Sequence, residues 1–189
     1  GVSRTVVREA IQILSAKGLL AARSGVGTIV RQVTRQSVLQ SVNLLLQTNF
    51  EGVTYEHLLQ VRTVLDIEIA GLAAQHATEA DVTHLKQILN EMERAKHVPE
   101  AIIGFDTDLH HKLASMTGNP LLIIFIDLIW DLIEEETRLV IQYVNPERDI
   151  IAVHPPIVEK IAARDVAGAR QAAQLHAAQT FRNHEATVG

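Results

Sequence analysis

The segment Phe105-Asp-Thr-Asp-Leu-His-His-Lys-Leu-Ala114 carries two patterns at once. Its apolar residues recur every four positions, beginning with Phe105, which predicts an amphipathic helix. Asp106 and His110 are also four residues apart, so they lie on one face of that helix, about one turn from each other. A carboxylate and an imidazole that face inward from one helix can supply half of a metal site. Taken alone, however, such a pair is more often a solvated acid and a hydrogen-bonded histidine.

Two more histidines, His154 and His176, are placed symmetrically about Asp165. Asp165 suits the N-cap of a helix, so the sequence predicts two antiparallel helices joined by a tight turn at that point. His154 precedes Asp165 by eleven residues and His176 follows it by eleven, which puts both at the same height. With Asp106 and His110 they would form a set of one Asp and three His. Such ligands suit Zn²⁺, Ni²⁺, Mn²⁺ or Fe²⁺ and leave positions open for water or a ligand.

Most of the chain after residue 36 has a helical pattern. The breaks fall at glycine, threonine and proline, and seven helices with short connections predict an all-α bundle over residues 36–187. The alanine-rich tail indicates close helix packing. The predicted helices span 36–48, 53–76, 79–97, 100–116, 120–144, 154–163 and 166–185.

Composition limits the class of protein. The 189 residues are 47% hydrophobic, which is enough for one sizeable core and a small second domain. The sequence has no cysteine, which excludes disulfides and thiolate metal sites. The longest apolar run, 121–133, contains two aspartates and is too short to span a bilayer. Without a signal-peptide pattern, we expect a cytoplasmic protein that does not enter a membrane.

Charge is distributed unevenly along the chain. Residues 1–36 contain six Lys or Arg and one acid, whereas the remainder contains eleven basic and 21 acidic residues. A compact basic segment beside an acidic body favours an anionic partner at the N-terminal end.

The N-terminal segment is predicted to form a helix followed by a hairpin. Ser3 suits a helix N-cap, apolar positions recur at helical spacing after it, and Lys17-Gly18 ends the helix. The two short strands that follow are separated by Ser24-Gly-Val-Gly27. A basic-tipped helix and a glycine-rich hairpin are typical of the second half of a winged helix-turn-helix, in which the helix enters the major groove. We therefore predict a partial winged helix over residues 1–33.

The residues from Gly1 to Leu20, followed by Arg23-Ser-Gly-Val-Gly-Thr28, closely resemble the recognition helix and wing of GntR-family transcription regulators. Val6 stands where that family commonly has proline. The family's earlier helices are not represented, so we expect the N-terminal part of the motif to be missing from this chain. The resemblance implies that the DNA contacts are made by Ser3, Arg4, Thr5, Arg8 and Gly25.

The helical part resembles the FCD ligand-binding domain of the FadR subfamily of the same family. In metal-binding members the ligands are one Asp and three His, and the resemblance places them on the same four residues that the spacing selected. Pro155 and Pro156 depart from the pattern and put His154 at the start of a helix. The matching motifs are Arg62-x-x-Leu65-Asp66, Asp106-x-x-Leu109-His110, Ser115-x-x-Gly-Asn-Pro120 and His154…Asp165…His176.

Three further residues are candidates for ligand binding. Arg62 is either a surface arginine paired with Asp66, four residues on, or a guanidinium that points into the bundle and binds a carboxylate, as the resemblance implies. Arg138 is expected to be exposed, and the alternative is that it lines the pocket. Asn119 is expected to lie in the turn after the helix of Asp106. Trp130 is expected in the core or on a dimer face. The remaining isolated histidines, expected at the surface or at helix caps, are His57, His76, His84, His97 and His184.

These patterns predict a homodimeric transcription regulator, and a repressor is the commoner form in the family. It would bind a palindromic DNA operator and sense a small carboxylate through a bound divalent metal and Arg62. The alternative from another class is a helical metal-dependent hydrolase that uses the same Asp/His site. The sequence contains neither a His-Asp doublet nor His-Glu-x-x-His, so we expect no enzymatic activity. A metal-free bundle that serves only for dimerisation is a second alternative.

Overall fold

The computed structural model describes residues 1–31, 37–38, 40–42, 44–45, 52–144 and 150–188. The chain divides into two compact units, Gly1–Glu51 and Gly52–Gly189, and each is described by itself. The predicted domain boundary between residues 33 and 36 lies outside the described residues. So does part of the helix predicted over 36–48, although its described residues are helical.

The first thirty residues of the first unit form a helix and a hairpin. Helix α1 spans Arg4–Ala16, and its N-cap Ser3 accepts a hydrogen bond from the Val6 N–H at 3.3 Å. Strand β1 (Leu20–Arg23) pairs in antiparallel fashion with β2 (Gly27–Val30). Gly25 and Gly27 have positive φ angles of 75° and 101°, which only glycine adopts at little cost. The predicted helix and hairpin are confirmed.

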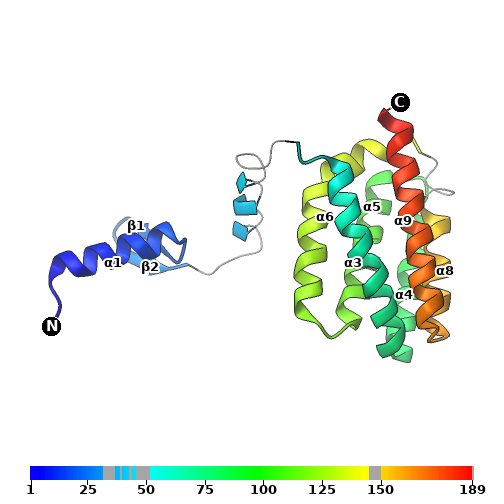
Figure 1. Ribbon diagram of the computed structural model, residues 1–189, viewed down its shortest axis with the longest axis horizontal. Helices are drawn as coiled ribbons and strands as arrows, with labels where there is room; N and C mark the ends of the chain where they lie inside the picture. Colours follow the sequence, from blue (N-terminus) through cyan, green and yellow to red (C-terminus); the bar gives the residue numbers. More distant parts are fainter. Residues whose placement is uncertain (32–36, 39, 43, 46–51, 145–149, 189) are drawn as a thin grey trace. The chain divides into compact units, whose positions relative to one another are not determined.

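The second unit is a bundle of helices around α3 (Figure 1). Helix α3 contacts α5, α6, α8 and α9, so it forms the centre of the bundle. The elements are α3 (Tyr55–His76), α4 (Glu79–Arg94), α5 (Pro99–Met116), α6 (Pro120–Val140), the 3₁₀ helix η1 (Ile151–Val153), α8 (Pro155–Ala162) and α9 (Val166–Val188). The predicted helices are found, but α4 and α6 end before residues 97 and 144, and α9 continues past residue 185.

Local chemistry explains where these helices begin. Thr54 and Thr78 form capping boxes with His57 and Asp81 at the starts of α3 and α4. Proline occupies the first helical position of α5, α6 and α8, where no backbone donor is required. His57 is therefore a capping residue, as expected, whereas the surface position expected for His184 is wrong. His184 is 9% exposed because its ring packs against Tyr55.

The core lies between α3 and the surrounding helices. Trp130 is 4% exposed and belongs to this core. Of the two positions expected for it, the core and a dimer face, the first is found. Small side chains allow α3 and α9 to approach closely, namely Ala70, Ala73, Ala74, Ala169 and Ala173. In the described part of the chain, no helix combines the length and the apolar character needed to cross a membrane.

Asp81 joins two helices, and its substitution should lower stability. One carboxylate oxygen accepts from Lys112 Nζ on α5 at 2.6 Å, and the other from the Thr78 N–H at 3.0 Å. These hydrogen bonds, with Lys112 first, lower the pKa of Asp81 to about 2. We expect Asp81→Asn to reduce the free energy of unfolding by about 1–2 kcal/mol at pH 7.

Urea denaturation measures this effect, and its pH dependence has a defined sign. Because the pKa is lowered in the folded state, the contribution of Asp81 is complete above its ordinary pKa and is lost as the pH falls towards about 2. The control is Glu91→Gln, since the Glu91–Arg94 pair is exposed and its loss should change stability by less than about 0.5 kcal/mol. Equal losses in both variants would contradict a special role for Asp81.

Candidate metal centre

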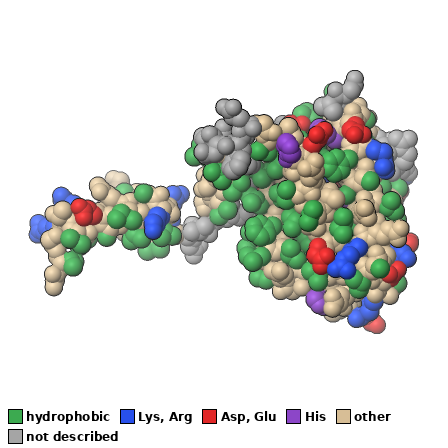
Figure 2. Space-filling model, in the orientation of Figure 1, with side chains coloured by type: hydrophobic (Ala, Val, Ile, Leu, Met, Phe, Trp, Pro, Cys, Tyr) green, Lys and Arg blue, Asp and Glu red, His purple; other side chains and the backbone are tan. Residues whose placement is uncertain are grey.

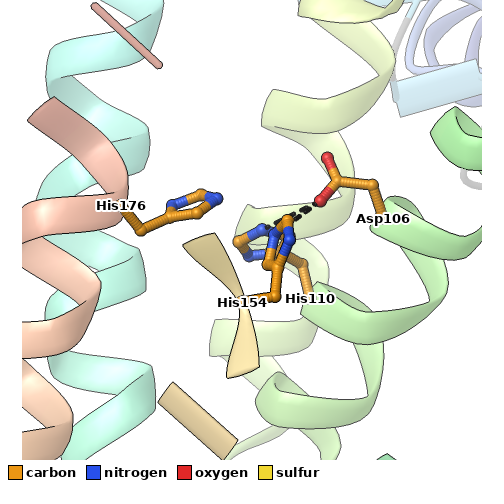
Figure 3. Close-up of side chains that lie close together, drawn as sticks. All are labelled: Asp106, His110, His154 and His176. Carbon is orange, nitrogen blue, oxygen red and sulfur yellow. Dashed lines mark ion pairs between the residues drawn. The ribbon is translucent and has the colours of Figure 1, made fainter. Parts of the chain in front are cut away.

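Four side chains from three parts of the bundle converge at one point (Figure 3). Asp106 and His110 project from α5, His154 precedes α8, and His176 lies on α9. All four are buried, and each offers a ligand atom such that these atoms lie within 4.8 Å of one another. The structure therefore brings together the four residues selected from the sequence.

The turn between α8 and α9 sets the level of two histidines. Asp165 Oδ1 accepts a hydrogen bond from the Gly168 N–H at 2.8 Å, which caps the start of α9. The two helices then run antiparallel away from this turn. As a result the rings of His154 and His176 meet, with 4.7 Å between their centroids. The side chain of His154 is fully buried at the N-cap position, just before Pro155, as the sequence predicted.

The donor atoms of this cluster fit a cation. Within the described residues, Asp106 Oδ1, both ring nitrogens of His154 and Nδ1 of His176 are buried without a well-oriented hydrogen bond. His154 Nε2 approaches Asp106 Oδ1 to 2.8 Å, but the groups are not aligned for hydrogen bonding. Each unsatisfied buried polar group costs about 1–3 kcal/mol. A divalent ion bound to three imidazoles and one carboxylate would satisfy Asp106 Oδ1 and one ring nitrogen of each histidine.

The protonation states also suit metal binding. Burial alone would raise the pKa of Asp106, but its interactions with His154 and Arg62 hold that pKa well below its usual range. Burial lowers the pKa of His176, and the positive charge of Arg62 nearby lowers it further. A charged carboxylate and a neutral imidazole are the forms that bind a metal ion.

Arg62 lies beside the cluster, inside the bundle. Its Nε donates to Asp66 Oδ2 at 3.1 Å, and its guanidinium stacks on Trp130, 4.1 Å from the ring centroid. Arg62 is only 5% exposed. The predicted pairing with Asp66 is therefore found, but the surface position is not, because both partners are buried. Asp66 Oδ1 also lies 3.1 Å from His110 Nδ1, a contact that was not predicted from the sequence.

A small cavity of about 50 Å³ adjoins the cluster. Arg62, Asp106, His154 and His176 all line it. Its other polar wall residues were not predicted from the sequence, although Thr180 and Asn183 follow His176 by four and seven residues and so share its helix face. The remaining residues of the cavity wall are Tyr55, Thr137, Val140, Ile141, Ile150 and Val153.

Two predicted ligand-binding residues lie apart from this cavity. Asn119 caps α6, where its side chain accepts from the Leu121 N–H at 3.0 Å. Arg138 is exposed, pairs with Glu134 at 2.7 Å and lines a different groove along α5 and α6. His111, which follows His110, is half exposed and pairs with Asp127 at 2.9 Å. The cluster therefore does not draw on these residues.

The residues expected to contact DNA lie in the first unit. Arg4, Thr5 and Arg8 are exposed on the first turns of α1, and Ser3 caps that helix. Gly25 lies in the turn between β1 and β2.

Comparison with known families identifies both parts of the chain. The FCD domain model matches residues 57–179, and the model for bacterial regulatory proteins of the gntR family matches residues 1–30. The chain belongs to the GntR family. Its helical unit is an FCD domain, and the resemblance found in the sequence is confirmed.

Three curated relatives of this GntR-family chain are regulators. It is 34% identical to HTH-type transcriptional regulator LutR of Bacillus subtilis, over 72% of this chain and 62% of the relative. It is 34% identical to the Uxu operon regulator of Haemophilus influenzae, over 69% of this chain and 47% of the relative. It is 33% identical to the fatty acid metabolism regulator protein of Shewanella amazonensis, over 67% of this chain and 52% of the relative. The chain thus spans about half to three-fifths of their length, and these names give the hydrolase alternative no support.

Solved structures show the same fold. Streptococcus agalactiae GntR matches with a TM-score of 0.67 at 23% identity, covering 96% of this chain and 82% of that one. E. coli McbR/YncC matches with a TM-score of 0.63 at 19% identity, covering 98% of this chain and 81% of that one. The mainly α fold with a small wing is confirmed.

Proposed function

We propose that this GntR-family chain is a transcription repressor whose FCD domain senses a small organic acid through a bound divalent metal ion. The observation that carries the proposal is the buried set of Asp106, His110, His154 and His176 beside a small cavity that a buried arginine also lines. Its relatives are named as transcription regulators. Such a protein acts in the cytoplasm, where its operator lies.

The N-terminal unit supplies the chemistry for DNA binding. Arg4 and Arg8 are exposed on the same end of α1 as Thr5, so they can reach phosphates and base edges in a major groove. Glycine at position 25 allows the hairpin backbone to approach the DNA closely.

The cavity fits a small carboxylate. Arg62 provides a guanidinium, and the metal ion would add positive charge and open coordination positions for the ligand's oxygens. A cavity of about 50 Å³ has room for only a few groups the size of a water molecule, so the expected effector is a short acid. Tyr55, Thr180 and Asn183 can hydrogen-bond its remaining oxygens.

A second copy of the chain is the proposed partner of an exposed apolar face on α3 and α6. Figure 2 shows hydrophobic side chains gathered over these helices of the FCD domain. Monomers rarely expose large contiguous apolar patches. A symmetric dimer would cover the face and match a palindromic operator. The residues of this α3–α6 face are Val61, Val64, Leu121, Ile124 and Phe125, each at least half exposed.

A thermal-shift screen tests the sensing function. Zinc-loaded protein is heated with short mono-, di- and hydroxy-carboxylic acids, and the screen is repeated after chelation. We expect one class of acid to raise the melting temperature only when zinc is present, because both the metal and Arg62 bind the carboxylate. Arg62→Ala should abolish the response, whereas Arg138→Ala, at an exposed arginine outside the cavity, should retain it.

Two outcomes would count against the proposal. A response that persists after chelation would show that the acid binds elsewhere than at the metal. A melting temperature that neither zinc nor any acid changes would favour a bundle that serves only for dimerisation.

A further inference from the structure

His110 is held at both ring nitrogens, unlike the other two histidines of the cluster. Its Nδ1 lies 3.1 Å from Asp66 Oδ1, and its Nε2 lies 3.0 Å from Arg62 Nη2. A guanidinium nitrogen can only donate a hydrogen bond. Nε2 of His110 must therefore accept, which leaves the ring proton on Nδ1, from where it is donated to Asp66. The two contacts together specify one neutral tautomer of His110.

This tautomer decides which nitrogen faces the metal site. Nε2 lies 3.7 Å from Asp106 Oδ1, so it is the nitrogen that can join the cluster, while Nδ1 is committed to Asp66. Histidines that bind metals usually donate their other N–H to a carboxylate, which fixes the ring and makes the ligating nitrogen more basic. Asp66 is placed to do this from α3, a helix that contributes none of the four ligands.

The contact on Nε2 has a second consequence. A neutral imidazole has one lone pair in the plane of the ring, at the nitrogen that carries no proton. Arg62 uses that lone pair, and a metal ion bound by the four residues needs the same one. The Arg62–His110 hydrogen bond and a metal–His110 bond therefore exclude each other.

We propose that Asp66 is a positioning residue for the metal site and that metal binding at His110 releases an Arg62 N–H for the effector. This inference rests on the proposed metal-dependent sensing function. Asp66 orients His110, and the metal displaces Arg62 Nη2 from His110 Nε2.

The released guanidinium stays where an effector can reach it. Arg62 remains tied to Asp66 through Nε and stacked on Trp130, so only one edge of the group changes partner. Arg62 already lines the cavity that adjoins the cluster. A carboxylate that binds the freed N–H leaves the lone pair of His110 available to the metal. Metal and anion therefore favour each other's binding, as linkage requires of both.

The test uses zinc alone as the probe and the full chain as the protein. Zinc affinity is measured by competition with a chromophoric chelator, and ¹⁵N NMR reports the ring nitrogens of His110 and the side-chain N–H groups of Arg62. In the wild type, we expect Nδ1 of His110 to carry the proton before and after zinc is added. The Arg62 signals should shift on zinc binding as the bond to His110 is broken.

Asp66→Asn tests the positioning role. Its zinc affinity should fall by about 10–100-fold, and His110 should populate both tautomers. The matched control is Asp127→Asn, which removes the carboxylate partner of the neighbouring His111 and should change neither zinc affinity nor the His110 tautomer. The wild-type Arg62 measurement needs no substitution, so it decides the release step even if Asp66→Asn does not fold.

The outcomes separate this inference from the function on which it rests. If the wild type does not bind zinc, both this inference and the proposed metal-dependent sensing function are wrong. If the wild type binds zinc but Asp66→Asn binds it equally well with an unchanged tautomer, the positioning role of Asp66 is wrong and the metal site stands. If zinc binds without any change in the Arg62 signals, the release of Arg62 is wrong.

Discussion

His154→Ala is expected to weaken zinc binding by more than about 100-fold, since loss of an outer partner of a ligand alone costs about 10–100-fold. His154 is fully buried and contacts all three other members of the cluster. Its Nε2 lies 2.8 Å from Asp106 Oδ1, and its ring centroid lies 4.7 Å from that of His176 and 5.7 Å from that of His110. Chelator competition measures the affinity directly.

The same loss should appear in thermal stability. At free zinc of about 1,000 times the wild-type dissociation constant, binding adds about 4 kcal/mol to the folded state, or about 10 °C in melting temperature. A dissociation constant raised 100-fold reduces this gain to about 1.4 kcal/mol. His111→Ala is the control, because His111 is half exposed and lies outside the cluster. A similar zinc response in wild type and His154→Ala would contradict the four-residue site.

The sequence predicts this cluster unusually well because its geometry follows from helix periodicity. Asp106 and His110 share a face because they are four residues apart, and His154 and His176 share a level because a turn lies midway between them. Both arguments are local or depend on a single turn. The N-terminal helix and hairpin are predicted for the same reason, since Ser3 and the glycines mark their ends.

The surroundings of the cluster could not be predicted in this way. Asp66 and His110 are 44 residues apart and meet across α3 and α5, so their contact depends on how two helices are rotated about their axes. The burial of Arg62 could not be predicted for the same reason, because Arg62 and Asp66 are four residues apart whether the pair faces solvent or the core. Arg138 shows the opposite outcome on α6, where an equally spaced pair with Glu134 is exposed.

Phe125→Asp is expected to convert the proposed dimer into monomers. Phe125 is 50% exposed in the α3–α6 face, and its neighbour Ile124 is 54% exposed. An aromatic anchor at an interface contributes at least about 2 kcal/mol, and a symmetric dimer contains it twice. Association should therefore weaken by roughly 1,000-fold, because about 1.4 kcal/mol corresponds to tenfold. Sedimentation velocity over a range of protein concentrations measures the change.

Leu175→Asp provides the matched control, because Leu175 is 65% exposed on α9, outside the α3–α6 face. It should leave the oligomeric state unchanged, and a wild type that is monomeric at micromolar concentration would contradict the proposed partner. Zinc affinity gives a further distinction. All four metal-site residues come from one chain, so monomeric Phe125→Asp should bind zinc as the wild type does. The proposed palindromic operator would present two half-sites, so the same variant should lose operator affinity while the proposed metal site remains intact.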